Sequence, residues 1–94
     1  MTKGEVISII SDKTGVDKAV TSITVEAFFQ TVKDSLASGE AIYVRGFGSF
    51  VNKKRAEKKA RNISQKTTVT VPAHFIPSFK PSKEFVEEVK TNVK

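Results

Sequence analysis

Residues 53–66 read KKRAEKKARNISQK, and this stretch decides how the rest of the chain must be arranged. It holds seven basic residues and one acidic residue, so its excess charge of +6 equals the formal net charge of the whole chain. Only Ala56, Ala60 and Ile63 are apolar, and burying so many charges would cost several kcal/mol per ion. The stretch must therefore lie in solvent or against a polyanion, which we interpret as DNA phosphate.

The rest of the chain is short and electrically balanced. The 94 residues are 38% hydrophobic, and those outside 53–66 include nine basic and nine acidic residues. This length predicts one domain, 1–94, and a domain so small buries only about 60–65% of its unfolded surface. A dimer that shares one core would relieve this shortage of buried surface.

Composition also argues against several kinds of site. The chain has no cysteine, which excludes a disulfide framework and a thiolate metal site. His74 has no ligand-type neighbour at metal spacing, so we expect a structural role for it and neither a metal nor another cofactor. No signal peptide pattern and no apolar run near the roughly 20 residues of a membrane span are present, so we expect a cytoplasmic protein without a membrane partner.

The first 40 residues have the pattern of two helices. Thr2 and Glu5 fit a capping box, and Gly15 predicts the end of a helix of about three turns. Asp17 and Gly39 mark the expected start and end of a second helix. Its apolar residues form a broad stripe, which predicts packing on two neighbours. Those assigned to the core and dimer interface are Phe29, Val32 and Leu36.

The pattern becomes extended over 41–81. Segments 41–44 and 47–51 predict strands joined by a turn. The β-branched segment 67–71 is expected to pair with the segment before the basic run, closing a hairpin with its tip around 62–66. Residues 75–81 predict an extended chain that brings Phe75 and Phe79 to the core. The further core or interface residues are Val44, Phe47, Phe50 and Phe79.

The last helix and the conformation of the basic stretch complete the local predictions. Ser82 is the expected cap of a last helix within 82–94, whose alternating charges are typical of a solvated face. The composition of 53–66 is equally compatible with a solvated helix and with a strand, because Lys, Arg, Ala and Glu favour helix.

Taken together, the motifs resemble those of the bacterial HU/IHF family of histone-like DNA-binding proteins. The resemblance is carried by VRGFGSF at 44–50, the basic arm ending in Arg-Asn at 61–62, VPA at 71–73 and IPSFKPSK at 76–83. It implies an α+β fold in an intertwined homodimer. Residues 1–40 would form the helical pair, 41–81 a small antiparallel sheet with a protruding β-ribbon arm, and 82–94 a short C-terminal helix.

The resemblance also implies a function and a set of contact residues. It implies an architectural nucleoid protein that binds double-stranded DNA in the minor groove with little sequence specificity and bends or compacts it. A strand over 53–62 would extend about 33 Å and would reach around a duplex. The residues assigned to DNA contact are Lys3, Gly46, Lys53, Arg55, Lys58, Lys59, Arg61, Asn62, Ile63, Lys66, Lys80 and Lys83.

Three positions depart from the family pattern. Ile63 stands where the family usually has a proline that wedges between base steps, and we assign the wedge role to this isoleucine because it is also apolar. Lys66 replaces a usual glycine of the arm tip. Ser82 replaces a usual glycine before the last helix.

Other classes of function remain to be weighed. The run 46–51 begins like a dinucleotide fingerprint but has Val51 in place of the third glycine, so we expect no enzyme and no small-molecule substrate. A module for RNA or polyanions in general is an alternative, although the basic arm lacks the aromatic residues on which RNA bases stack. A sequence-specific IHF-like subunit, which would form a heterodimer with a paralogue, is another.

Overall fold

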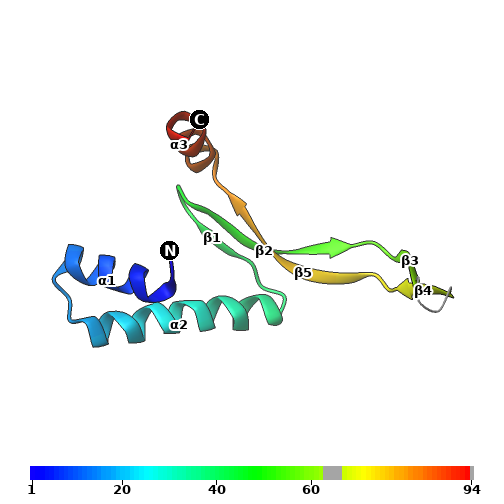
Figure 1. Cartoon of the computed structure of the whole chain (residues 1–94), viewed down its shortest axis with the longest axis horizontal. Helices are drawn as coiled ribbons and strands as arrows, with labels where there is room; N and C mark the ends of the chain where they lie inside the picture. The colour runs from blue at the N-terminus through cyan, green and yellow to red at the C-terminus, as the bar shows by residue number, and fades with distance from the viewer. Residues whose placement is uncertain (63–66, 94) are drawn as a thin grey trace.

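The computed structural model describes the backbone of residues 1–62 and 67–93, and the side chains of 1–59 and 68–93. In chain order, the elements of this part are α1 (Lys3–Thr14), α2 (Lys18–Ala37), β1 (Ile42–Val44), β2 (Gly48–Arg55), β3 (Lys58–Asn62), β4 (Thr67–Val71), β5 (His74–Pro81) and α3 (Lys83–Asn92). Figure 1 shows α1 and α2 side by side, a ribbon projecting from the strands, and α3 at the far end of β5. The α+β class is confirmed.

Local capping signals determine the helix ends. The Thr2 hydroxyl accepts a hydrogen bond from the Glu5 amide at 3.3 Å, and Asp17 caps α2 through the amide of its second residue at 3.1 Å. Gly15 and Gly39 end the two helices with φ values of 73° and 86°, a backbone region in which glycine carries no steric cost. These predicted boundaries are confirmed.

The three-stranded antiparallel sheet has the order β1-β2-β5. β2 is central, and its first residue, Gly48, passes so close to β5 that an added Cβ would lie 2.5 Å from the Lys80 carbonyl oxygen. β5 is an edge strand, which explains how it accommodates Pro77 and Pro81 without losing ladder hydrogen bonds.

Beyond this sheet, β3 and β4 form a separate two-stranded antiparallel ribbon. The expectation that 67–71 pairs with the segment before the basic run was wrong, because β4 pairs with β3 inside the basic run and β2 pairs with β5. The expected continuous strand over 53–62 was also wrong, because β2 ends at Arg55 and β3 begins at Lys58. The interruption lies opposite Pro72, which has no amide hydrogen to donate to a ladder.

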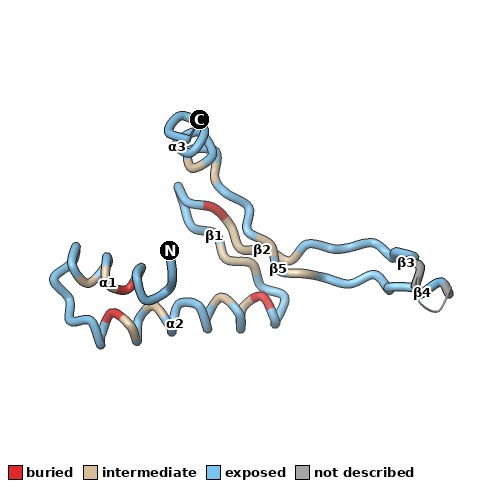
Figure 2. Tube along the Cα trace, viewed as in Figure 1, coloured by how far each residue is buried: buried red, intermediate tan, exposed pale blue. Residues whose placement is uncertain are grey.

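Very little of the chain is buried. Among the described residues, Ile7 and Leu36 are the only buried hydrophobic side chains, with 6% and 9% exposed. Figure 2 shows the few buried positions on the helix pair and the start of β2, and exposed residues along the ribbon. Phe75 is 66% exposed, so the expectation that it joins the core was wrong. Its strand carries it out along the ribbon, where it pairs with Lys54.

The molecule is elongated because the ribbon projects from a body with few buried residues. The radius of gyration is 18.8 Å, whereas a compact domain of this length would have about 12 Å. The molecule is 58 Å long and about half as thick. A domain with so few buried side chains and so long a projection is not typical of a protein that is stable as a monomer.

Candidate nucleic-acid interface

The ribbon carries a dense group of exposed cations. Lys53, Lys54 and Arg55 are the last residues of β2, and Lys58 and Lys59 are the first of β3. All five are exposed, and the only ion pair within the described residues joins two other side chains, so none of the five is neutralised there. We call these five residues the ribbon cations.

Strand register divides the ribbon cations between two faces. Arg55 pairs with His74 and Lys58 with Val71, so two residues interrupt each strand between the ladders. Alternation within β2 places Lys53 and Arg55 on one face and Lys54 on the other, and alternation within β3 places Lys58 and Lys59 on opposite faces. Lys53 and Arg55 therefore share one face of the ribbon.

Lys54 belongs to the opposite face by the same alternation. Lys54 pairs with Phe75, which lines a shallow concavity beside Leu36 and Asn52 at the C-terminal end of α2. This face of the ribbon therefore continues into the side of the sheet that meets the helices.

The face of Lys53 continues into the outer face of the sheet. Tyr43, Ser49 and Lys80 form one cross-strand row on this outer face. The next row, Ile42, Phe50 and Phe79, points to the other side of the sheet by alternation. A shallow concavity on the outer face is lined in part by Tyr43, Arg45, Lys80 and Ser82. Basic groups of the body and of the ribbon thus share one side of the molecule.

The turn between β1 and β2 lies at the end of this outer face. Gly46 is exposed and has a φ of 79°, which requires a residue without a Cβ to be free of strain. Its carbonyl oxygen accepts a hydrogen bond from the Ser82 hydroxyl at 3.0 Å, and the Phe47 carbonyl accepts one from the Ser82 amide at 2.8 Å. The turn is therefore tied to the start of α3.

The remaining predicted contact residues lie in different places. Lys3 opens α1 and forms an ion pair with Glu26 of α2. Lys83 is the exposed first residue of α3. Arg61 and Asn62 end β3, and only their backbone is described. Ile63 and Lys66 lie outside the described residues, so their assigned contacts stay predictions.

The apolar residues assigned to a core or interface gather around an aromatic cluster. Its centre is Phe79, whose ring lies 5.0 Å from that of Phe47 and 5.2 Å from that of Phe50. Phe85 of α3 stacks on Phe47, and Phe28 of α2 meets Phe50 edge to face. Leu36 is buried and Val32 and Phe50 are half-buried, whereas the exposed members of the predicted set are Phe29, Val44, Phe47 and Phe79.

Sequence reasoning missed two residues of the basic side and one exposed cation of the ribbon. Arg45 and Tyr43 were assigned only to a turn and a strand, and Lys54 was left out of the contact set although it is exposed beside two residues in it. A charge next to the turn glycine was the available signal for Arg45. The signal for Tyr43 needs the strand pairing, since only its row with Ser49 and Lys80 places it on the basic side.

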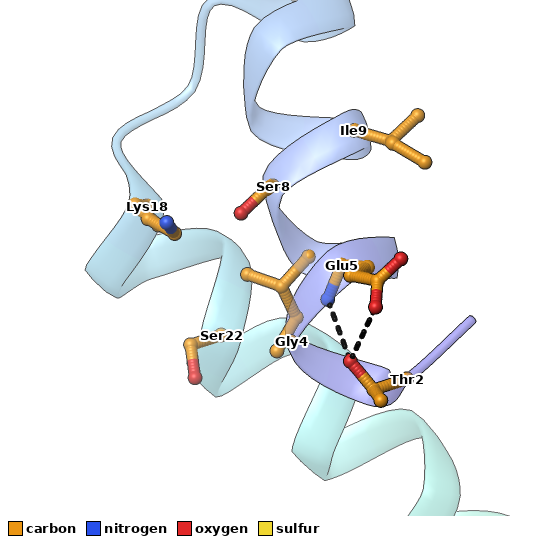
Figure 3. Close-up of a pocket in the computed structure, with 8 residues that line it drawn as sticks. Thr2, Gly4, Glu5, Ser8, Ile9, Lys18 and Ser22 are labelled. Atoms are coloured by element: carbon orange, nitrogen blue, oxygen red, sulfur yellow. Dashed lines mark hydrogen bonds between the residues drawn. The ribbon is translucent and has the colours of Figure 1, made fainter.

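A separate concavity lies between the first turns of α1 and α2, and Figure 3 shows the side chains that line it. Thr2 and Glu5 hydrogen bond to each other there, while Lys18 and Ser22 come from the neighbouring helix. Within 1–62 and 67–93, no three His, Asp or Glu side chains gather in a way that could hold a metal ion. In the same ranges, no helix has the length and apolar character needed to cross a bilayer.

Comparisons with known proteins agree with this geometry. The SPbeta prophage-derived DNA-binding protein HU 2 of Bacillus subtilis is 38% identical to the chain over 90 residues, which are 96% of this chain and 98% of the relative. Integration host factor subunit beta of Marinobacter nauticus is 38% identical over 95 aligned positions, covering 100% of this chain and 97% of the relative. The Anabaena HU-DNA cocrystal structure matches with a TM-score of 0.89 at 30% identity, over 95% of this chain and 97% of that one.

The family model described as "Bacterial DNA-binding protein" matches residues 1–90. This match covers the helix pair, the sheet, the ribbon and most of α3, so no element is left to another family. The resemblance drawn from the motifs of the sequence is confirmed: the chain belongs to the family of bacterial DNA-binding proteins that includes HU and integration host factor.

Proposed function

We propose that this protein is an architectural DNA-binding protein that holds duplex DNA between two ribbons and bends or compacts it. The observation that carries the proposal is the set of five exposed ribbon cations, none of which is paired within the described residues. A surface of this kind attracts a polyanion, and phosphate contacts of Lys and Arg carry no base sequence information. Low sequence specificity follows.

A homodimer is the second part of the proposal. A single chain leaves the aromatic cluster open, with Phe47 and Phe79 43% and 38% exposed and Phe28 and Phe29 each 46% exposed. Contiguous apolar surface of this kind marks a protein interface. A second copy would cover the cluster and place a second ribbon on the assembly, so that two ribbons could grip one duplex.

DNA would lie along the outer face of the sheet and between the ribbons. Lys53 and Arg55 share that side with Lys80, and Lys54 faces away by register. We place Lys59 with the first group and Lys58 with Lys54, as side-chain alternation continued along the ribbon would have them. We assign the first group to contacts with phosphates and the minor groove, whose negative potential attracts such cations. Ile63 remains our choice for the residue that wedges between base steps.

Binding to linear, nicked and kinked duplexes across a salt series tests the proposal. We expect affinity to fall steeply with salt, at a slope of about 0.9 per neutralised phosphate, and the complex mass to correspond to two chains. Binding that stayed constant between low and physiological salt would refute phosphate contact, and a complex with one chain would refute the dimer.

Bending is measured separately by energy transfer between dyes at the two ends of a duplex. We expect Ile63→Ala to reduce bending more than affinity and Arg55→Ala to reduce affinity. Unchanged bending by the Ile63→Ala protein would remove the wedge role from this residue without removing the binding function.

A sequence-specific function is the second candidate, because the integration host factor subunit beta of Marinobacter nauticus is as similar as the HU relative. Competition between random-sequence duplexes separates the two. Discrimination below about tenfold among sequences supports the architectural function, since base readout typically contributes a factor of about 10³ or more.

An RNA-binding alternative gains one observation. The basic segment 53–66 contains no aromatic residue, but β5 places Phe75, 66% exposed, opposite Lys54 on the ribbon. Phe75 belongs to the face that continues toward α2, away from Lys53 and Arg55. A single-stranded RNA competitor tests whether this ring contributes, and we expect duplex DNA to be preferred.

A further inference from the structure

We propose that Ser82 is a positioning residue for DNA binding, one that fixes the turn at 45–47 relative to Lys80 and Lys83. The inference rests on the proposed function, because it concerns how the body of the protein meets DNA.

Ser82 makes three hydrogen bonds that converge from different elements. Its hydroxyl accepts from the Phe85 amide at 3.2 Å and so caps α3. The same hydroxyl donates to the Gly46 carbonyl at 3.0 Å, and its amide donates to the Phe47 carbonyl at 2.8 Å. One residue thus connects the turn before β2, the end of β5 and the start of α3.

Such a connection is rare in this chain. Within the described residues, only two side-chain hydrogen bonds join segments more than ten positions apart, Asn52 to the Leu36 carbonyl and Ser82 to the Gly46 carbonyl. The first holds the sheet against α2. The second holds the turn on the basic side of the molecule.

The groups around Ser82 are those that would meet a phosphate backbone. Arg45, Lys80 and Ser82 line the same concavity on the outer face of the sheet, and Lys83 follows directly in sequence. Arg45 lies in the exposed turn. The turn is held by the Phe47 amide, which donates to the Val44 carbonyl, and by the Ser82 hydroxyl, which donates to the Gly46 carbonyl. Removing the hydroxyl would leave the turn attached to the start of α3 by the Ser82 amide and by the stacking of Phe47 on Phe85.

Fixing a cationic turn in advance favours binding because less conformational freedom is lost when DNA arrives. A helix cap alone would act differently, since it would change stability and leave the number of neutralised phosphates unaltered. The two roles can therefore be separated by experiment.

Ser82→Gly is the informative variant. Glycine keeps the backbone hydrogen bond to Phe47 and serves as a tolerable helix cap, so the melting temperature should change little. We expect the affinity for a duplex to fall by at most about fivefold per substituted protomer, because DNA binding must then remove the freedom that the hydrogen bond had removed in advance. The slope of log affinity against log salt should fall by about 0.9 for each phosphate that the turn no longer neutralises.

Two further variants control the result. Ser82→Thr retains the hydroxyl and should restore affinity and slope. Ser38→Gly removes a hydroxyl bonded to the Ser35 carbonyl at 2.8 Å at the end of α2, outside the concavity that Arg45, Lys80 and Ser82 line, and should leave both quantities unchanged.

The outcomes distinguish this inference from the proposed function. A parent protein that does not bind duplex DNA would overturn the proposed function itself. A parent that binds, with a Ser82→Gly variant of equal affinity and salt slope, would overturn only the positioning role. A Ser82→Gly variant with a lowered melting temperature and an unchanged slope would also overturn it, since Ser82 would then serve only α3.

Discussion

The division of ribbon cations between two faces leads to a direct test with a matched pair of variants. Lys58 and Lys59 are adjacent, equally charged and both exposed on β3, but they pair with Val71 and Thr70 and so belong to opposite faces. Replacing either with glutamine removes one charge per chain. Lys59→Gln should remove a phosphate contact, whereas Lys58→Gln should remove only a distant charge.

The expected magnitude follows from counterion release. In a dimer, Lys59→Gln removes two cations from the DNA-facing side, which lowers the slope of log affinity against log salt by about 1.8. Over a fourfold rise in salt, the parent should then lose about twelvefold more affinity than the variant. Lys58→Gln should lower the slope by well under half as much as Lys59→Gln does.

Fluorescence anisotropy of a labelled duplex, titrated at salt concentrations between about 50 and 200 mM, measures both slopes. Circular dichroism of the free variants provides the folding control. Equal slopes for the two variants, or a larger loss in Lys58→Gln, would refute the assignment of faces and with it the course of DNA along the outer face of the sheet.

Three further predictions concern the body of the protein. Glu26→Gln releases Lys3 from its ion pair, so DNA affinity should rise and the salt slope should steepen by about 0.9 per protomer. The free energy of unfolding should change by less than about 1 kcal/mol. A DNA titration with no gain in affinity would contradict this. Gly48→Ala would place a Cβ 2.5 Å from the Lys80 carbonyl oxygen, and urea denaturation should show a loss of about 1–3 kcal/mol, whereas parental stability would show that the strands can separate at no cost. Phe79→Ala removes the centre of the aromatic cluster and should lower the free energy of unfolding by about 3–5 kcal/mol per chain. The parent's melting temperature should rise with protein concentration, and a constant melting temperature would argue against a core shared by two chains.

Local signals in the sequence were sufficient for the helices. Thr2, Asp17 and Ser82 each cap the helix that they were expected to cap, because a capping hydrogen bond spans only two or three residues. The glycines at the helix ends acted in the same local way. None of these features depends on how distant segments meet.

Strand pairing required information that the local sequence does not contain. The partner of 67–71 was misassigned because that partner, β3, lies in a basic segment whose residues favour helix. Phe75 was expected in the core from its apolar character alone, whereas its position opposite Lys54 is fixed by the pairing of β2 with β5.

The same limit applies to the candidate site. Charge density correctly predicted that the basic residues from 53 to 59 are exposed, since a surplus of cations cannot be buried. Which cations share a face depends on register, and register is known only once both strands and their interruption are known. Tyr43 was missed for this reason, as its place beside Lys80 comes from β1, β2 and β5 together.

The interruption opposite Pro72 has a consequence for amide hydrogen exchange. It divides the ribbon into a ladder of eight residue pairs rooted in the sheet and an outer ladder of five that has no third strand beside it. Two-stranded ladders of that length are barely stable in water. The outer ladder should therefore open and close many times for each opening of the inner one, and amides of β3 should exchange with deuterium well before those at the start of β2.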